Sequence, residues 1–400
     1  MSTVGTGSSD CPAPRATGHA ATQPPALSYI PELDGLRAIA VILVLINHYV
    51  PTSIASMWRL KAVGWVGVDL FFVLSGFLIT RILIETRTRE TYYRDFYVRR
   101  TLRIFPLYYC VLVVIFSAML LWHHGAAYRE LAHWGNPLWS WLYLENVQIV
   151  MLDKAPRAFS LVPLWSLHVE EQFYLLFPLV VRLMSPRALV KVLVGVVVGA
   201  PLLRLVLWWL DPGNQYVDYM LLPCRFDALA LGALIAIRIK RPIQIDRRLL
   251  GALTIGAATV VYVLFATLGH NLWNDPFTRV WGYSLFPAAF GCMVLWIVRY
   301  RGSWQTNWLN AAPLQFVGKT SYAIYLLQAP VAGALGVLLG STLIWSSDVI
   351  RFVLICATTI GLAALSWRFL ERPLLQLKER FAPAKPPAAE HAETAAGTAA

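Results

Sequence analysis

Two ionisable side chains interrupt the apolar segment 33–49, LDGLRAIAVILVLINHY. Arg37 and His48 are eleven positions apart, which in a helix is roughly 16 Å, about half the hydrocarbon thickness of a bilayer. Ionisable residues within a membrane cost about 2.5–3.5 kcal/mol each on insertion scales and commonly mark functional sites. His48 is therefore a candidate proton acceptor, because imidazole titrates near neutral pH. The alternative is a structural His48 and an Arg37 whose charge reaches the membrane surface.

A basic cluster in the segment 98–109, VRRTLRIFPLYY, is the second candidate site. Arg100 and Arg103 are one helical turn apart and can share a face, with Arg99 beside them. Guanidinium groups bind phosphate through paired hydrogen bonds, so this cluster suits a phosphorylated soluble ligand. The aromatic residues that follow, including Tyr109, suggest a shaped pocket. Contact with lipid headgroups explains the same arginines without a soluble ligand.

Two adjacent carboxylates, Glu170 and Glu171, lie in the segment 163–178, PLWSLHVEEQFYLLFP. Carboxylates that enter a membrane span need a partner or a proton. One that faces His48 would orient its ring, as the third group does in nucleophile–base–orienter arrangements. Alternatively, both stabilise the start of a helix, where negative charge is favoured. The spacing does not show which of the two points inward.

Weaker candidates lie in three other apolar segments, one of which, 318–331, contains Ser321, Tyr322 and Tyr325. Asp69, Ser75 and Gly76 fall within 64–80, where the small residues predict close helix packing. Arg225 and Asp227 begin the segment 225–236 and predict a structural ion pair. As candidate substrate-binding residues we take Asp69, Tyr174, Asp227 and Tyr322.

The composition predicts an all-α polytopic membrane protein. The 400 residues are 58% hydrophobic and only 14% charged, more apolar surface than a soluble chain of this length can bury. The net charge of +12 fits the Lys and Arg of cytoplasmic loops and needs no nucleic-acid partner. The five cysteines form no CxxC pair, and His123, His124 and His133 lack ligand spacing, so no metal site is expected.

Hydropathy predicts about ten membrane spans, while the segment 138–152, which contains Glu145 and Asn146, is expected to be re-entrant or interfacial. Basic residues gather in every even-numbered connection, which predicts that both termini are cytoplasmic. The arginines then lie toward the cytoplasm, with His48 and the two glutamates further out at similar depths. Residues 1–28 and 378–400 are expected to be disordered tails. The predicted spans are 36–50, 65–84, 104–122, 170–185, 188–210, 219–238, 249–268, 281–299, 316–340 and 348–370.

Taken in order, these motifs resemble the acyltransferase 3 family of membrane O-acyltransferases. The matching segments are ELDGLRAIAV with His48 beyond it, GVDLFFVLSGFLIT, the pair Arg100 and Arg103 followed by IFP, WSLHVEEQFY, RFDALALGALIA, SYAIYLLQAP and FLERPL. Each is weak alone. Their common order is specific for the family, although not for a substrate.

The resemblance implies a ten-span domain over residues 29–377 in the cytoplasmic (inner) membrane of a bacterium. Its expected activity is transfer of an acyl group, usually acetyl, from acyl-CoA to a hydroxyl of a carbohydrate-containing acceptor. Acyl-CoA is then a donor substrate, and no cofactor is expected to stay bound. The resemblance assigns His48 as the catalytic base and Arg37 as its motif partner. It also implies a functional acid at Glu170 or Glu171 and donor binding at Arg100 and Arg103, beside which Arg99 and Tyr109 are further candidates.

Two residues depart from the family pattern. His168 stands where a small residue such as Ser is usual and would add a titrating group beside Glu170, and Gln328 stands where His is common. Two other functions use the same residues, namely a transporter of an anionic solute and a glycolipid flippase. Transporters commonly contain internal repeats with interrupted helices, and the sequence shows no such repeat.

Overall fold

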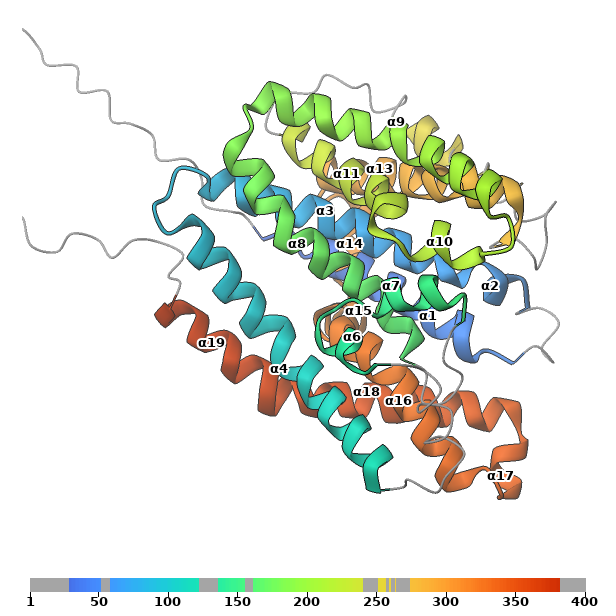
Figure 1. Cartoon of the computed structure of the whole chain (residues 1–400). Helices are drawn as coiled ribbons and strands as arrows, with labels where there is room; N and C mark the ends of the chain where they lie inside the picture. The colour runs from blue at the N-terminus through green and yellow to red at the C-terminus, as the bar shows by residue number, and fades with distance from the viewer. Residues whose placement is uncertain are drawn as a thin grey trace, which may run out of the picture.

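The computed structural model describes residues 29–51, 58–121, 136–154, 161–239, 251–256, 259, 263 and 274–381, and within these ranges it contains helices and no strand (Figure 1). The predicted tail 1–28, most of the tail 378–400 and most of the predicted span 249–268 lie outside the described residues. Helix α19, Arg372–Phe381, continues four residues past the predicted domain end at 377.

Seven helical segments of the described part are long and apolar enough to cross a membrane, so the chain is an all-α polytopic membrane protein as predicted. The expected number of about ten spans is not confirmed. The seven segments are Lys61–Thr86, Tyr92–Ala118, Pro186–Leu210, Gln215–Ile239, Thr278–Arg299, Ser321–Leu339 and Asp348–Leu377.

Two further predicted spans, 36–50 and 170–185, are also helical, but their helices contain more charged residues than the apolar parts of the seven segments. Helix α1, Glu32–Tyr49, and helix α8, Trp165–Leu183, have 18 and 19 residues. Either is about 27–29 Å long, close to the hydrocarbon thickness of a bilayer. Each contains three residues that are Asp, Glu, Lys or Arg, and those on α1 and the two glutamates of α8 are turned toward protein or cavities. The charges of α1 and the two glutamates of α8 therefore belong to the interior of the bundle.

Helices α1, α3 (Gly67–Thr86) and α11 (Leu222–Ile239) form the centre of the bundle (Figure 1). The backbones of α3 and α11 touch at Gly76 and Gly232, where a methyl group on either glycine would overlap the facing main chain. The close packing predicted for the segment 64–80 is therefore confirmed at Gly76.

Helix α4, Tyr92–Leu121, begins twelve residues before the predicted span at 104. All the arginines from Arg94 to Arg103 therefore project from one continuous helix, which runs through Pro106. Helix α19 packs beside α4, as Figure 1 shows.

The segment 138–152 is not a span, as predicted. It forms two short helices, α6 (Leu138–Trp141) and α7 (Glu145–Leu152), the longer of which has eight residues, about 12 Å. Glu145 is fully buried between them and accepts a hydrogen bond of 2.9 Å from the Ser140 hydroxyl. Burial raises the pKa of Glu145 to about 7, although the Ser140 hydrogen bond opposes the shift.

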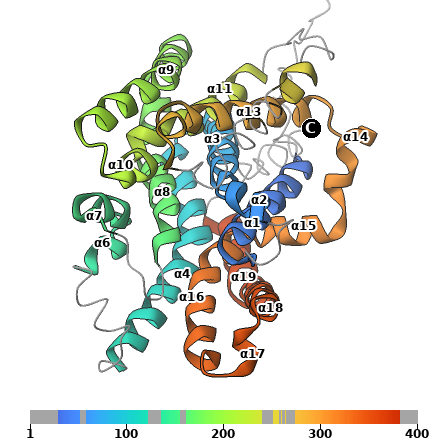
Figure 2. The ribbon, with the colours of Figure 1, turned by 90° about the vertical axis from the view of Figure 1, so that its right-hand side faces the viewer.

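The predicted span 316–340 is interrupted at Thr320. Helix α15, Ala312–Lys319, packs against α1 (Figure 2). Helix α16, Ser321–Leu339, is the part of the predicted span that is long and apolar enough to cross a membrane. The remaining elements are α2 (Trp58–Val63), η1 (Gly64–Val66), η2 (Val162–Leu164), α9 (Pro186–Leu210), α10 (Gln215–Met220), the π-helical turn η4 (Thr278–Gly282), α13 (Tyr283–Arg299), α14 (Trp304–Asn307), η5 (Trp308–Asn310), α17 (Leu343–Ser346), α18 (Asp348–Ser366) and the π-helical turn η6 (Trp367–Glu371).

Candidate active site

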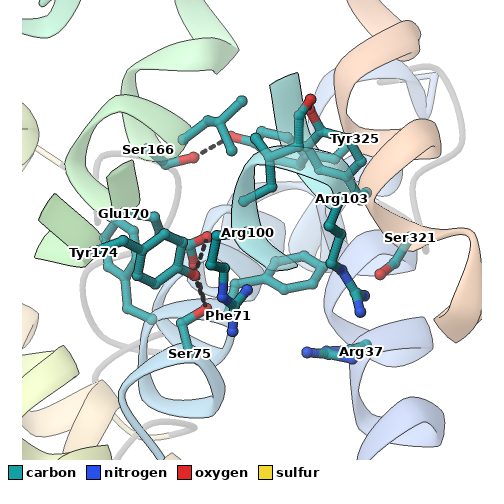
Figure 3. Close-up of a pocket in the computed structure, with 14 residues that line it drawn as sticks. Arg37, Phe71, Ser75, Arg100, Arg103, Ser166, Glu170, Tyr174, Ser321 and Tyr325 are labelled. Atoms are coloured by element: carbon teal, nitrogen blue, oxygen red, sulfur yellow. Dashed lines mark hydrogen bonds between the residues drawn. The ribbon is translucent and has the colours of Figure 1, made fainter. Parts of the chain in front are cut away.

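Three arginines from two helices face one cavity of about 80 Å³, which we call the arginine cavity (Figure 3). Arg100 and Arg103 reach it from successive turns of α4, and Arg37 reaches it from the second turn of α1. The shared face predicted for Arg100 and Arg103 is therefore confirmed. Tyr174 and Tyr322, two of the candidate substrate-binding residues, line the same cavity.

The arginine cavity carries excess positive charge. Arg37 is paired with Asp34 at 3.1 Å, whereas no carboxylate of the described residues lies within ion-pair distance of Arg100 or Arg103. The Arg100 guanidinium lies 4.7 Å above the ring of Tyr174, a cation–π contact that fixes its position. Guanidinium groups that face a cavity without a counterion favour an anionic ligand, phosphate in particular.

Among the described residues, Glu170 is the one acidic side chain that lines this cavity. Its Oε1 accepts a hydrogen bond of 2.6 Å from the Ser75 hydroxyl, and its Oε2 accepts one of 3.0 Å from the Tyr174 hydroxyl (Figure 3). Glu171 does not line the cavity, so Glu170 is the glutamate that points inward. Both residues follow the start of α8 at Trp165 by more than a turn, which excludes the alternative that they cap the helix.

Ser75 has a different role from the one predicted. We expected it to allow close helix packing, but it lines the arginine cavity and donates a hydrogen bond to Glu170. The neighbouring Gly76 packs against α11 instead. Adjacent residues of a helix point about 100° apart, so one can face a cavity while the next faces a partner helix.

His48 lies in a second cavity of about 220 Å³, which we call the histidine cavity. The imidazole is exposed to this space, and its Nδ1 lies 3.3 Å from Oε1 of Gln328 on α16. Gln328 is fully buried, and its Nε2 has no partner among the described residues. Because the amide oxygen can only accept, it places the proton of a neutral imidazole on Nδ1 and leaves the lone pair on Nε2.

The orienting group of His48 was predicted wrongly. We expected a carboxylate of the Glu170–Glu171 pair at this position, at a depth similar to that of His48. The structure places Gln328 there, while Glu170 lies among the arginines in the other cavity. Among the described residues, only Tyr325 lines both cavities, and its hydroxyl lies 2.6 Å from the Ser166 hydroxyl. The two cavities therefore adjoin at Tyr325.

Two of the candidate donor-binding residues do not line the arginine cavity. Arg99 is absent from its walls. Tyr109 packs its ring on Trp141 of α6, with centroids 5.6 Å apart, and donates a hydrogen bond of 3.2 Å to the Trp141 carbonyl.

His168 lies away from Glu170, contrary to the expectation that it would add a titrating group beside it. Its Nε2 lies 2.8 Å from the oxygen of the Tyr108 hydroxyl, which donates its proton to the Ser140 carbonyl, on the side of α8 that faces α4 and α6. The reason is helical geometry, because residues two apart project to opposite sides of a helix.

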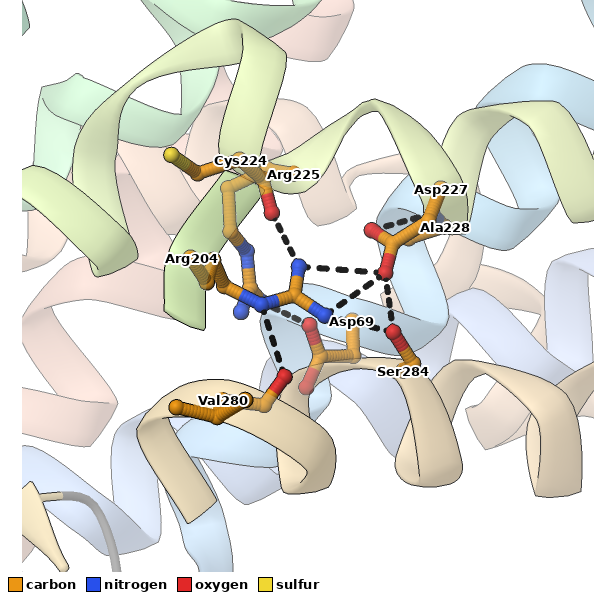
Figure 4. A network of polar contacts seen from close by, with 8 residues as sticks. All are labelled: Asp69, Arg204, Cys224, Arg225, Asp227, Ala228, Val280 and Ser284. Atoms are coloured by element: carbon orange, nitrogen blue, oxygen red, sulfur yellow. Dashed lines mark hydrogen bonds and ion pairs between the residues drawn. The ribbon is translucent and has the colours of Figure 1, made fainter. Parts of the chain in front are cut away.

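Asp69 and Asp227 belong to a buried network of charges (Figure 4). Asp69 pairs with Arg225, and Asp227 pairs with Arg204 of α9 at 3.0 Å. The ion pair predicted between Arg225 and Asp227 is therefore wrong, since residues at i and i+2 of a helix do not face each other. Neither aspartate lines the arginine cavity or the histidine cavity.

Replacement of Asp69 by Ala should destabilise the protein by about 3–5 kcal/mol, because the buried guanidinium of Arg225 would lose its counterion. Thermal unfolding of the detergent-solubilised protein measures this effect. The double variant Asp69→Ala with Arg225→Met should recover part of the lost stability, since no unpaired charge remains. An unchanged unfolding temperature together with weaker acceptor use would instead support the substrate-binding role predicted for Asp69.

The sequence reasoning missed Ser166 and Arg204, and it did not predict that Tyr325 lines both cavities or that Gln328 contacts His48. For Ser166 a signal was available, because it lies four residues before Glu170 and eight before Tyr174, on one face of α8. For Arg204 the signal was a lone arginine in the apolar run PLLRLVLWW, which requires a buried partner. The sequence held no comparable signal that Gln328 would contact His48, 280 residues away.

Comparison with known proteins identifies similar sequences. The family model for acyltransferase 3, described as an acyltransferase domain, matches residues 30–368. The chain is 30% identical over 367 residues to the peptidoglycan O-acetyltransferase OatA of Listeria monocytogenes, an alignment that covers 86% of this chain and 56% of that protein. It is 29% identical over 378 residues to the O-acetyltransferase OatA of Staphylococcus aureus, covering 86% of this chain and 57% of that protein.

The chain thus spans little more than half the length of the curated relatives that it matches. No solved structure matches it.

Proposed function

Because the chain belongs to the acyltransferase 3 family, we propose that it is a membrane O-acyltransferase that moves an acyl group from acyl-CoA to a hydroxyl of a carbohydrate acceptor. The observation that carries this proposal is the pair of adjoining cavities, one with uncompensated arginines and one with His48. The arginine cavity suits an anionic donor, and the histidine cavity suits a hydroxyl that loses its proton to His48.

The arginine cavity would hold the donor. Arg100 and Arg103, with Arg37 opposite, offer guanidinium donors to the phosphates of coenzyme A. By the positive-inside rule, these arginines and both termini would lie at the cytoplasmic side of a bacterial cytoplasmic membrane, where acyl-CoA is available. The acyl thioester would then extend past Tyr325 and Ser166 toward His48.

His48 would act as the general base. Its Nε2 takes the proton of the acceptor hydroxyl as the hydroxyl oxygen forms a bond to the thioester carbonyl carbon. The carbon–sulfur bond then breaks, and the proton passes to the leaving thiolate, which gives the ester and free coenzyme A. The Gln328 oxygen holds Nδ1–H during this cycle and so keeps the lone pair on Nε2.

The names of the two relatives suggest the acceptor class, since one is called a peptidoglycan O-acetyltransferase. We therefore propose acetyl as the acyl group and a cell-envelope carbohydrate as the acceptor. Membranes that contain the protein should transfer radiolabel from acetyl-CoA to a glycan as a base-labile ester. Label that crosses the membrane or stays non-covalent would contradict the enzyme and support a transporter or flippase.

Replacement of Gln328 by Leu should lower kcat by about 2- to 10-fold, because one net hydrogen bond that orients His48 is lost. The KM for acetyl-CoA should stay the same, since Gln328 does not line the arginine cavity. Steady-state kinetics on membranes give both values. Gln328→Glu keeps an acceptor oxygen at the same reach and should retain more activity than Gln328→Leu; equal losses would contradict the orienting role.

A further inference from the structure

The two cavities meet on one face of helix α16. Ser321 lines the arginine cavity, and Tyr325, four residues later, lines both cavities. Gln328, three residues further along, contacts His48. Residues with this spacing share one face of a helix. That face of α16 therefore passes from the arginine cavity to the histidine cavity at Tyr325.

Helix α3 passes between the same two cavities. Val68 lines the histidine cavity, whereas Phe71 and Ser75 line the arginine cavity. These three residues also share one face, because they are three and four positions apart. Phe71 is the one nearer to Val68, roughly 4.5 Å along the helix axis. On α3 the junction between the cavities therefore lies beside Phe71.

An aromatic contact closes this junction. The ring of Phe71 packs edge-on against the ring of Tyr325, with centroids 6.1 Å apart and an angle of 69° between the ring planes. The Tyr325 hydroxyl donates a hydrogen bond of 2.5 Å to the Pro163 carbonyl. Its oxygen accepts one of 2.6 Å from the Ser166 hydroxyl (Figure 3). The Tyr325 ring cannot turn aside without breaking both hydrogen bonds, so the junction has a fixed width.

The direction of the donor places its acyl group at this junction. Figure 3 shows Ser166 and Tyr325 on one side of the arginine cavity and Arg37 on the opposite side. In an acyl-CoA the phosphates and the acyl group are at opposite ends of an extended molecule. A donor whose phosphates contact the arginines therefore reaches the junction with its acyl group first.

We propose that Phe71 and Tyr325 form an acyl filter, which accepts an acetyl group and excludes longer acyl chains. Acetyl has only a methyl group beyond the carbonyl carbon, and this methyl fits beside the partly exposed ring of Phe71. A longer chain would have to displace that ring or the tethered ring of Tyr325, and packed side chains resist added methylene groups. The inference rests on the donor site of the proposed function, because an acyl-CoA is what brings an acyl chain to this junction.

The test compares radiolabelled acetyl-CoA with propionyl-CoA, which is one methylene longer, on membranes that contain the full chain. The wild type should transfer acetyl with a kcat/KM about 10-fold or more above that for propionyl, the discrimination that one methylene allows. Phe71→Leu makes room at the junction and should bring the two donors to within about threefold of each other. Phe71→Ala makes more room and should extend transfer to butyryl-CoA.

Phe77→Leu is the matched control. Phe77 lies on the same helix, is only 1% exposed and lines neither cavity. The same substitution there loosens the packing of α3 without widening the junction, so the preference for acetyl-CoA should stay that of the wild type. Coenzyme A without an acyl group is the control ligand. Isothermal titration should give it equal affinities for the wild type and Phe71→Leu.

The outcomes separate the acyl filter from the proposed function. Equal kcat/KM values for both donors in the wild type would overturn the filter and leave the enzyme standing, as would equal shifts in Phe71→Leu and Phe77→Leu. If no donor is transferred, the proposed function is wrong and binding decides the filter. Tighter binding of acetyl-CoA than of propionyl-CoA that is lost in Phe71→Leu would then support it, and equal affinities in the wild type would overturn it.

Discussion

The His48→Ala variant should lose transfer of acetyl label from acetyl-CoA by about 10²- to 10⁴-fold, the contribution expected of a positioned general base. The physical reason is that His48 is the titratable imidazole of the histidine cavity, with its Nδ1 held by Gln328. Base-labile radiolabel on glycan, measured in membranes with matched amounts of protein, gives the rate. Binding of acetyl-CoA should not change, because His48 does not line the arginine cavity.

Tyr49→Phe is the matched control for this experiment. Tyr49 is the next residue of α1 and lines neither cavity, so its variant should transfer label at the wild-type rate. His48→Ala must also elute as a single species from size-exclusion chromatography in detergent, which separates loss of the base from loss of the fold. Undiminished transfer by a folded His48→Ala protein would show that His48 is not the base.

The double variant of Arg100→Ala with Arg103→Ala should bind acetyl-CoA far more weakly than the wild type. A charge-assisted hydrogen bond contributes about 1.5–3 kcal/mol, so each arginine is expected to account for about a 10- to 100-fold change in donor affinity. Isothermal titration with coenzyme A on the purified protein measures this directly and does not depend on turnover. Arg100→Lys should fall between the wild type and Arg100→Ala, because an ammonium keeps the charge but not the fork of donors.

Arg99→Ala provides the control for the arginine cavity, since Arg99 lies on the same helix and does not line the cavity. It should bind coenzyme A within about twofold of the wild type. If Arg99→Ala and the double variant weaken binding equally, the general positive charge of the helix is responsible. If the double variant binds as the wild type does, the arginines have a role other than phosphate binding.

Helical periodicity accounts for the parts of the site that the sequence could predict. Arg100 and Arg103 share a face because they are three residues apart, and the cavity confirms it. The same rule would have joined Ser166 and Tyr174 to Glu170, and would have argued against an ion pair between Arg225 and Asp227. Residues within one or two turns of each other are placed by the helix itself, before any tertiary contact is made.

Contacts between helices account for what could not be predicted. Gln328 rather than a glutamate meets His48, and Asp69 rather than Asp227 meets Arg225, across separations of 280 and 156 residues. These partners depend on which helices pack together and at what rotation. A rotation of one residue, about 100°, replaces one partner by another. Close approach at Gly76 and Gly232 fixes one such rotation, and hence which faces of α3 and α11 remain for the charged residues.

Hydropathy and the penalty for charge in a bilayer are properties of single segments. For this reason the amino-acid sequence alone predicts a helical membrane protein whose arginines, histidine and glutamates must be kept away from lipid. In the folded protein these residues divide between two adjoining cavities, with Glu170 among the arginines and His48 against Gln328. That division depends on the packing of α1, α3, α4, α8 and α16, which no single segment specifies.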